Sequence, residues 1–551
     1  MIKLNPAFRP KLWDTLQNYN RQQFYKDIFA GLIVGIVALP LAIAFGIASG
    51  VPPEKGLITA VIGGLIVSAL GGSRVQIGGP TGAFIVIVYG IIQHYGIGGL
   101  WISTLIAGVL LIAMGIARFG NAIKFIPHSL IIGFTSGIAL IIFSSQIKDF
   151  LGLKMGAVPA DFIEKWDAFA IHFRTVNPYA LLVSASTTII LLIWPKFSYK
   201  IPGSLVAILL TTFVVHIIKL PVETIGSRFG SVTSALPAPA FPHIDFSTIR
   251  NLFQPAITIA LLAGIESLLS AVVADGMIGG NHRSNAELIA QGIANISSTV
   301  FGGIPVTGAI ARTATNVKNG GRTPIAGIIH ALTLLIIMLA AGKWAVLIPL
   351  PTLAGILVVV AFHMSEWQSF ISILKGPKSD AAVLVTVFLL TVLIDLTVAI
   401  EVGMVLAAFL FIRKMIRSTD VTSMDRESTS ENIEQYSVPQ HVEVFEINGP
   451  LFFGAAYKFK DAIREVEKTP RVLIIRMRKV PIIDVTGIRT LQEVYKEFRK
   501  KGTRIILSEV ESRQVLDELR DSRLQFAIGK SNITQTFPLA IQRAEQILKD
   551  S

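Results

Sequence analysis

Apolar segments follow one another from residue 27 to residue 416, separated only by short stretches rich in Gly, Pro, Lys and Arg. A membrane-spanning helix needs about 20 predominantly apolar residues, and a chain in hydrocarbon must satisfy its own backbone hydrogen bonds, as a helix does. Charged residues make up 15% of the sequence, whereas soluble proteins contain about 25%. The sequence therefore predicts an α-helical polytopic membrane protein.

The spacing of the apolar segments predicts twelve ordinary membrane-spanning helices and two short ones, broken by glycine, after Gly79 and Gly303. Lys and Arg gather in alternate loops, which we expect to face the cytoplasm, so an even number of spans places both termini on that side. Most of the formal net charge of +13 lies in this region. That charge reports membrane topology and does not indicate a nucleic-acid partner.

Residues 1–26 are predicted to form a cytoplasmic N-terminal segment, followed by a transmembrane domain at residues 27–417. Residues 418–439 are polar and rich in Ser, Thr and Glu, as linkers are. Strand and helix patterns alternate in residues 440–551 and predict a small soluble α/β domain. The sequence contains no cysteine, which excludes disulfides, thiolate nucleophiles and Cys-ligated metals.

A motif of glycines, a proline and a threonine occurs twice in the membrane region. GGPTGAF at residues 78–84 returns as GGIPVTGAI at residues 302–310, with an offset of 226 residues between the last glycines. Matching broken segments in two halves are typical of inverted-repeat transporters. Each break frees backbone N–H groups and points the positive end of a half-helix toward one place. We therefore predict an anion site, with the hydroxyls of Thr81 and Thr307 as further donors; glycines needed only for close helix packing are the alternative.

Two ionisable residues lie in apolar surroundings near these breaks. Arg312 is one turn into the second half-helix and can pair with a bound anion. Glu266 is near the middle of its predicted span, where a carboxylate can exchange a proton and act as the coupling group, and Ser270 shares its helix face one turn on. A structural ion pair between Arg312 and Glu266 is the alternative interpretation.

At these residues the chain resembles the SulP family of anion transporters. The segments that carry the resemblance are residues 38–46, 79–81 and 307–314 and the soluble tail. The family implies about fourteen transmembrane helices in two inverted seven-helix repeats, arranged as a core domain and a gate domain. Carried over by position, the residues that line the substrate site are Phe45, Pro80, Thr81, Thr307, Ala311 and Arg312. The same comparison places the coupling ion, a proton or sodium, at Glu266 and Ser270.

Narrower similarities within the family point to the substrate. The segments most similar to bacterial C4-dicarboxylate transporters are residues 134–137, 146–153, 265–269 and 273–277. Residues 44–50 are shared with a cyanobacterial branch of bicarbonate transporters. The resemblance implies proton-coupled uptake of C4-dicarboxylates such as succinate or fumarate, with proton- or sodium-coupled bicarbonate or sulfate transport as the alternative. Leu41 replaces the glutamine of many sulfate-transporting members, which argues against a plant-type sulfate permease.

The soluble tail resembles a STAS domain. Its residues 484–487 (DVTG) match the loop-to-helix motif whose hydroxyl is phosphorylated in anti-sigma-factor antagonists. Thr486 is therefore a candidate regulatory phosphosite, and a helix N-cap is its alternative role. The family also implies a homodimer in the bacterial inner membrane, with a cytoplasmic regulatory protein bound at the STAS domain.

The sequence has no GxxxxGK[ST] loop for ATP, no nucleophile–base pair and no cluster of metal ligands. We therefore expect no enzymatic activity, catalytic residue, cofactor or metal. The predicted function is secondary active transport of a small anion across the lipid bilayer by an elevator-type mechanism. An uncoupled anion channel or motor is a second hypothesis, against which the central Glu266 argues. A membrane receptor with a STAS output is a third.

Overall fold

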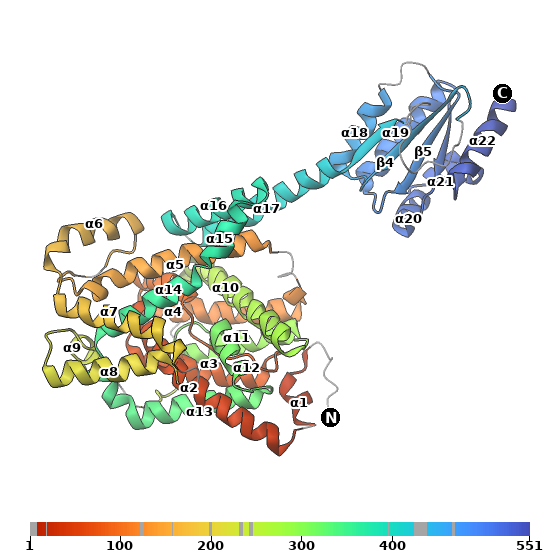
Figure 1. The fold of residues 1–551 in the computed structure, drawn as a ribbon. Coiled ribbons are helices and arrows are strands. Elements are labelled where there is room, and N and C mark those ends of the chain that lie inside the picture. Colours follow the sequence, from red (N-terminus) through yellow and green to blue (C-terminus); the bar gives the residue numbers. More distant parts are fainter. Residues whose placement is uncertain are drawn as a thin grey trace. The chain divides into compact units, whose positions relative to one another are not determined.

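A computed structural model describes residues 8–17, 19–121, 126–156, 158–197, 201–230, 235–241, 246–394, 396–423, 438–464 and 469–550. Its contacts divide the chain into two compact units, Met1–Met404 and Val405–Ser551. Each unit is described by itself (Figure 1).

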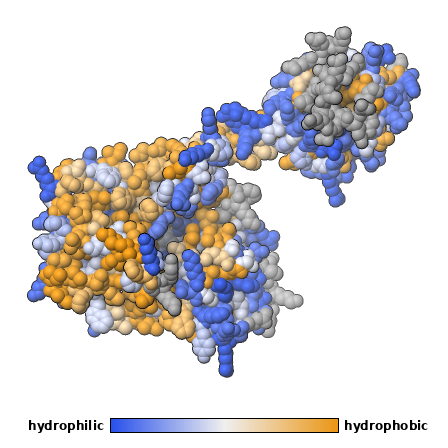
Figure 2. Space-filling view, viewed as in Figure 1, coloured by the Kyte–Doolittle hydropathy of each residue, from blue (hydrophilic) through white to orange (hydrophobic). Residues whose placement is uncertain are grey.

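The first unit is helical. Its long helices are α2 (Arg21–Ala48), α3 (Pro53–Leu70), α4 (Ala83–Ile116), α5 (His128–Leu151), α7 (Pro178–Ile193), α8 (Gly203–Ile218), α10 (Phe246–Ile278), α11 (Ser284–Val300), α12 (Ile310–Lys318), α13 (Pro324–Ala341), α14 (Leu350–Met364), α16 (Lys378–Leu393) and α17 (Leu396–Ser418), the last of which continues into the second unit. Shorter helices are α1 (Lys11–Leu16), α6 (Phe162–His172), α9 (Ile225–Phe229) and α15 (Trp367–Leu374). Nine helices of the described chain are long and apolar enough to cross a membrane. Apolar side chains cover much of the visible surface of this unit (Figure 2).

Helix α4 contains two helical segments in one continuous run. Gly96 adopts φ 69° and ψ −178° in its interior, a conformation outside the helical region that glycine tolerates. The break separates residues 83–95 from residues 97–116. Counted in this way, α2 to α17 without α6, α9 and α15 provide fourteen helical segments. The fold is thus the helical membrane bundle that the sequence predicted.

The helices of the first unit pack as two groups. One group consists of α2, α3, α4, α10, α11, α12 and α13, and the other of α5, α7, α8, α14 and α16. Glycines allow backbones to approach inside the first group. A Cβ added to Gly56 of α3 would lie only 1.9 Å from the carbonyl oxygen of Ala42 in α2.

The two copies of the repeated motif pair with each other. β1 (Gly78–Gly79) and β2 (Thr307–Gly308) form a two-stranded antiparallel ladder, with Gly78 opposite Gly308 and Gly79 opposite Thr307. The antiparallel direction is the one expected of segments from two inverted halves. The half-helices that follow, the first part of α4 and α12, therefore begin beside each other.

The second unit is an α/β domain. Its sheet has the order β3 (Asp420–Ser423), β4 (Val442–Asn448), β5 (Val472–Lys479), β6 (Arg504–Ser508) and β7 (Ile533–Thr534), with β3 antiparallel and the other strands parallel. Its helices are α18 (Phe453–Arg464), α19 (Val485–Lys500), α20 (Arg513–Asp521), α21 (Leu524–Ile528) and α22 (Phe537–Lys549). Alternate residues of the central strands face two separate apolar clusters, and α22 contributes to one cluster while α18 to α21 contribute to the other. Period-two alternation places helices on both faces of the sheet.

We predict that Gly56→Ala destabilises the first unit by about 1–3 kcal/mol, the usual effect of overpacking. The added methyl group meets a backbone oxygen that cannot rotate away. Thermal unfolding in detergent, followed by size-exclusion chromatography, measures the change. The matched control is Gly90→Ala in α4, where a Cβ meets nothing within 4 Å, so this variant should keep the wild-type midpoint. Equal midpoints for both variants would contradict the proposed close approach.

Candidate functional site

Polar side chains hold the broken segment before α12 in place. The Asn295 side chain accepts a hydrogen bond from the Val306 amide at 2.9 Å and donates one to the Val306 carbonyl at 2.9 Å. Thr59 accepts from the Ile304 amide at 2.7 Å, and Ser298 donates to the Ile304 carbonyl at 2.7 Å. Backbone groups that no helix can satisfy in hydrocarbon thus find partners inside the protein.

Arg312 is buried beside both breaks. Its side chain is on α12, the residue is 2% exposed, and its Nη2 donates a hydrogen bond to the carbonyl oxygen of Pro80. Its Nη1 has no hydrogen-bond partner among the described residues. A Cβ at position 79 would lie 2.5 Å from Nη1, and Gly79 has φ +152°. The glycine of the first motif therefore leaves room for the guanidinium of the second.

Glu266 lies on α10 and receives a hydrogen bond from the hydroxyl of Thr81 at 2.8 Å. Both residues are partly exposed. No ion pair joins Glu266 to Arg312, and within the described ranges neither residue has an oppositely charged partner within 4.0 Å. The interpretation of these two residues as a structural ion pair is therefore wrong.

The other predicted residues occupy less direct positions. The Thr307 hydroxyl is fully buried and donates to the Ala263 carbonyl at 3.0 Å. Ser270, also buried, donates to the hydroxyl of Thr313 at 3.3 Å. Phe45 is 5% exposed on α2, whereas Ala311 is exposed at the start of α12. The structure thus gathers Pro80, Thr81, Glu266 and Arg312, and it assigns the hydroxyls of Thr307 and Ser270 to contacts within the protein.

Sequence reasoning missed the buried carboxylate of Glu287 in α11. It is fully buried and accepts four hydrogen bonds, from Gly72 N at 2.8 Å, Ser73 N at 3.1 Å, Ser267 Oγ at 3.1 Å and Gln291 Nε2 at 3.1 Å. Glu287, Gln291 and Asn295 are spaced by four residues, which places them on one helix face. The four-residue spacing of this polar face can be seen in the sequence. Through Glu287 and Asn295, the face holds the segments that lead into the first and the second break.

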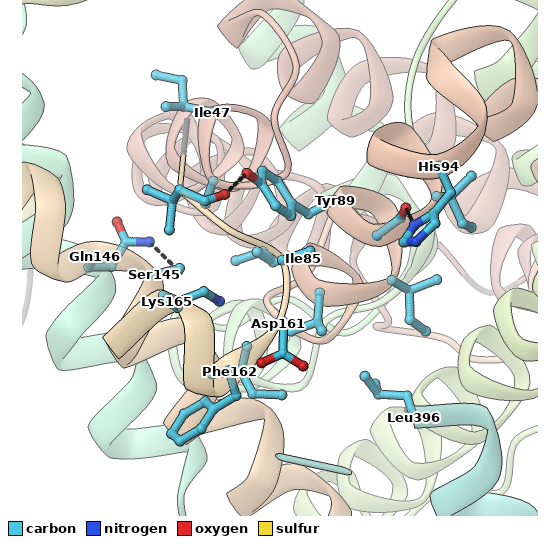
Figure 3. A pocket seen from close by; sticks show the side chains of 18 of the residues that line it. Ile47, Ile85, Tyr89, His94, Ser145, Gln146, Asp161, Phe162, Lys165 and Leu396 are labelled. Atoms are coloured by element: carbon cyan, nitrogen blue, oxygen red, sulfur yellow. Dashed lines mark hydrogen bonds between the residues drawn. The ribbon is translucent and has the colours of Figure 1, made fainter. Parts of the chain in front are cut away.

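A cavity of about 760 Å³ lies between the two helix groups. Its walls include Ala44 and Ile47 of α2, Ile85 and Tyr89 of α4, and residues of α5, α6, α10 and α14 (Figure 3). Thr81, Glu266 and Arg312 are not among the residues that line it. Ile85, however, is one helical turn beyond Thr81. The cavity therefore reaches the half-helix at whose beginning the gathered residues lie.

In the second unit, Thr486 is the second residue of α19 and is half-buried. The N-cap is Asp484, whose carboxylate accepts hydrogen bonds from Gly487 N at 2.7 Å and from Phe453 N at 3.0 Å. The alternative role of Thr486 as an N-cap is therefore wrong. Its role as a phosphosite stays a prediction.

A buried arginine with an unused donor, placed where two inverted helix breaks meet in a membrane bundle, defines a transport protein for anions. The comparisons agree with this class. Residues 24–387 match the model of the "Sulfate permease family", and residues 435–539 match the "STAS domain".

The chain is 41% identical over 519 residues to the "Putative sulfate transporter YvdB" of Bacillus subtilis (strain 168), covering 94% of this chain and 97% of that protein. It is 31% identical to the "Bicarbonate transporter BicA" of Picosynechococcus sp., over 87% of this chain and 88% of that protein. The structure of the murine Solute Carrier 26 family member A9 anion transporter has the same fold, with a TM-score of 0.88 at 18% identity, covering 99% of this chain and 96% of that one. The chain thus belongs to the sulfate permease family and is an anion transporter with a C-terminal STAS domain. These relatives are named for sulfate and bicarbonate, and they do not support the narrower similarity to C4-dicarboxylate transporters.

We predict that Asn295→Ala abolishes transport and destabilises the protein. It leaves two buried backbone groups of Val306 without partners, and each such group costs about 1–3 kcal/mol. Thermal unfolding and anion uptake measure the two effects. Asn285→Ala is the control, because that side chain, near the start of the same helix, accepts one bond from Gly120 and does not touch the breaks. Wild-type uptake by Asn295→Ala would show that the Val306 contacts are dispensable.

Proposed function

We propose that this chain takes up a small inorganic oxyanion, sulfate or bicarbonate, together with a proton. The observation that carries the proposal is the Arg312 guanidinium, which is buried where the two half-helices begin and has one nitrogen unpaired among the described residues. An arginine in such a place binds oxyanions through charge-assisted hydrogen bonds. The N-terminal ends of the two half-helices add to the attraction.

The number of cations at the site favours a compact substrate. A C4-dicarboxylate carries charge at both ends and needs a second cationic partner several ångströms from the first. Arg312 is the one cation among the four gathered residues. Sulfate and bicarbonate place their charge within a single small group. The names of the relatives, which concern sulfate and bicarbonate, support the same choice.

Glu266 supplies a reason for proton coupling. Its carboxylate is held by the neutral hydroxyl of Thr81 and has no cation within pairing distance in the described chain. An anion bound at Arg312 repels an ionised Glu266 and therefore favours its protonated form. Anion and proton then bind together and leave together. We propose Glu266 as the proton carrier, with Ser270 supporting the geometry of α10 through its contact with Thr313.

The two helix groups suggest how access alternates. All four gathered residues belong to the group formed by α2 to α4 and α10 to α13, or to the segment leading into it. Sliding of this group past the second one would move the site across the membrane as a unit, as an elevator does. We propose this motion, in a homodimer of the bacterial inner membrane with both termini in the cytoplasm.

The test is uptake of labelled sulfate, bicarbonate and succinate into proteoliposomes, each with an inward proton gradient or an inward sodium gradient. Proton-driven uptake of sulfate or bicarbonate supports the proposal. Sodium-driven uptake overturns the coupling ion, and proton-driven succinate uptake without the other two overturns the substrate. Anion binding without flux favours a motor or receptor.

We predict that Glu266→Gln uncouples transport. The amide keeps the hydrogen bond with Thr81 but cannot release a proton, so uptake should no longer respond to the proton gradient while anion exchange continues. Accumulation against exchange in the same vesicles is the measurement. Glu401→Gln on α17 is the control, since that residue is exposed and should leave coupling intact. Gradient-driven accumulation by Glu266→Gln would assign the proton elsewhere.

We predict that Arg312→Gln raises the apparent KM about 10- to 100-fold, since hydrogen bonds to a charged group contribute about 1.5–3 kcal/mol. Initial rates over a range of anion concentrations measure it. Arg118→Gln, at an exposed position after α4, should keep the wild-type KM. An unchanged KM in Arg312→Gln would remove this arginine from the binding site.

A further inference from the structure

The helix α6 places two charged residues, Glu164 and Lys165, at the cavity between the two helix groups; Glu164 is exposed and Lys165 is buried. Lys165 and Phe169 are its buried residues and lie four positions apart on one face. Ile163, Trp166 and Ile171 are exposed on its other sides. Glu164 and Asp167 are exposed as well. The helix therefore directs a lysine inward beside Phe169, while apolar and acidic residues face outward.

The amine of Lys165 points into the cavity without a partner. The residue is 3% exposed and lines the cavity, and Figure 3 shows its side chain reaching from α6 toward the space between Ser145, Ile85 and Asp161. No hydrogen bond or ion pair to its amine occurs among the residues that the structure describes. Desolvation by burial lowers the pKa of this amine, and the charge of Asp161 acts in the opposite direction.

Lys148, Arg228 and Asp161, which also line the cavity, have partners of their own. Lys148 donates to the carbonyl of Gly156 at 2.7 Å. Arg228 pairs with Asp149 at 2.6 Å and also with Glu223. The carboxylate of Asp161 accepts hydrogen bonds from the amides of residues 163 and 164 as the N-cap of α6. Lys148 thus uses one of its three donors, whereas Lys165 makes no hydrogen bond or ion pair with the residues that the structure describes.

Burial of the residue removes part of the hydration of its ammonium group, and an anion that enters the cavity compensates for this loss. The cavity is large enough for a small oxyanion and its first waters. It also borders Ile85, one turn from Thr81 along α4. An anion held at Lys165 therefore shares a cavity with the first half of α4, and Pro80, just before that half-helix, contacts Arg312.

We propose that Lys165 forms a second, peripheral anion site, which captures the oxyanion before it reaches Arg312. The ligand class rests on the proposed function, whereas the site itself rests on the cavity and the unpartnered amine. The cavity adjoins the end of α2 farthest from the N-terminus of the chain. With cytoplasmic termini, this is the external side, so the site serves uptake.

The kinetic test measures sulfate and bicarbonate uptake by intact cells that produce the full chain. Lys165→Gln should raise the apparent KM for the external anion about tenfold, as expected when one charge-assisted hydrogen bond is lost, with Vmax unchanged. Lys165→Arg should retain the wild-type KM. Lys154→Gln is the matched control, because it removes the same charge from an exposed position that does not line the cavity. An unchanged KM in Lys165→Gln overturns the proposal.

Chemical rescue separates charge from packing. The chain has no cysteine, so in Lys165→Cys a thiol reagent modifies position 165 alone. Aminoethyl methanethiosulfonate restores a positive charge there and should restore the low KM, whereas sulfonatoethyl methanethiosulfonate adds a negative charge and should raise it further. The wild-type protein should respond to neither reagent. Equal effects of the two reagents would show that position 165 acts through packing, which overturns the anion site.

A binding measurement without flux distinguishes this proposal from the proposed function. Purified protein in detergent is acetylated by a water-soluble succinimidyl ester with and without sulfate or bicarbonate, and the sites are quantified by mass spectrometry. The anion should protect Lys165 and leave Lys154 unprotected. Protection without transport in vesicles would overturn the proposed function and keep the site. A Lys165 amine that reacts equally with and without both anions, or that never reacts, overturns the site.

Discussion

The structure depends on how the protein satisfies two interrupted backbones in a medium that offers no water. The breaks at residues 78–82 and 302–309 release peptide groups that hydrocarbon cannot bind. Three sets of contacts within the protein bind these peptide groups and the segments beside them. They are the antiparallel ladder between β1 and β2, the side-chain amide of Asn295, and the carboxylate of Glu287, which accepts four hydrogen bonds. Because these contacts satisfy the backbone, Arg312 retains a nitrogen for a ligand.

The arrangement also separates binding from access. The proposed anion site belongs to one helix group, while the cavity lies along the boundary with the other group. Contacts within the first group are dense and polar near the breaks, so the site keeps its geometry when the boundary changes. In the proposed path of uptake, Lys165 at the boundary meets the anion before Arg312 does. Affinity and access can therefore be altered by different residues.

The repeated motif predicted that the two breaks lie together, because an internal repeat in a sequence reflects symmetry in the structure. It therefore also predicted that Thr81, Glu266 and Arg312, which are near the breaks, gather in one place. The absence of an ion pair between Glu266 and Arg312 could not be predicted from the sequence. A small shift or rotation of α10 against α12 decides whether the two side chains are within pairing distance. The N-cap role considered for Thr486 belongs to Asp484, two residues earlier in the same motif. Lys165 gave no signal, because only the tertiary fold turns the inward face of α6 toward a cavity. The polar face of α11 was visible in the sequence as a spacing of four, yet its partners come from distant segments.

The two-residue ladder of Gly78–Gly79 with Thr307–Gly308 has a consequence for evolution. Each half of the chain supplies part of one small platform, and Gly79 yields the space that the guanidinium of Arg312 fills. A change in one copy of the motif therefore alters the fit of the other, although 226 residues separate the copies. The sequences of the two motif copies therefore cannot change independently during evolution. We expect substrate preference in this family to change through paired substitutions across the ladder.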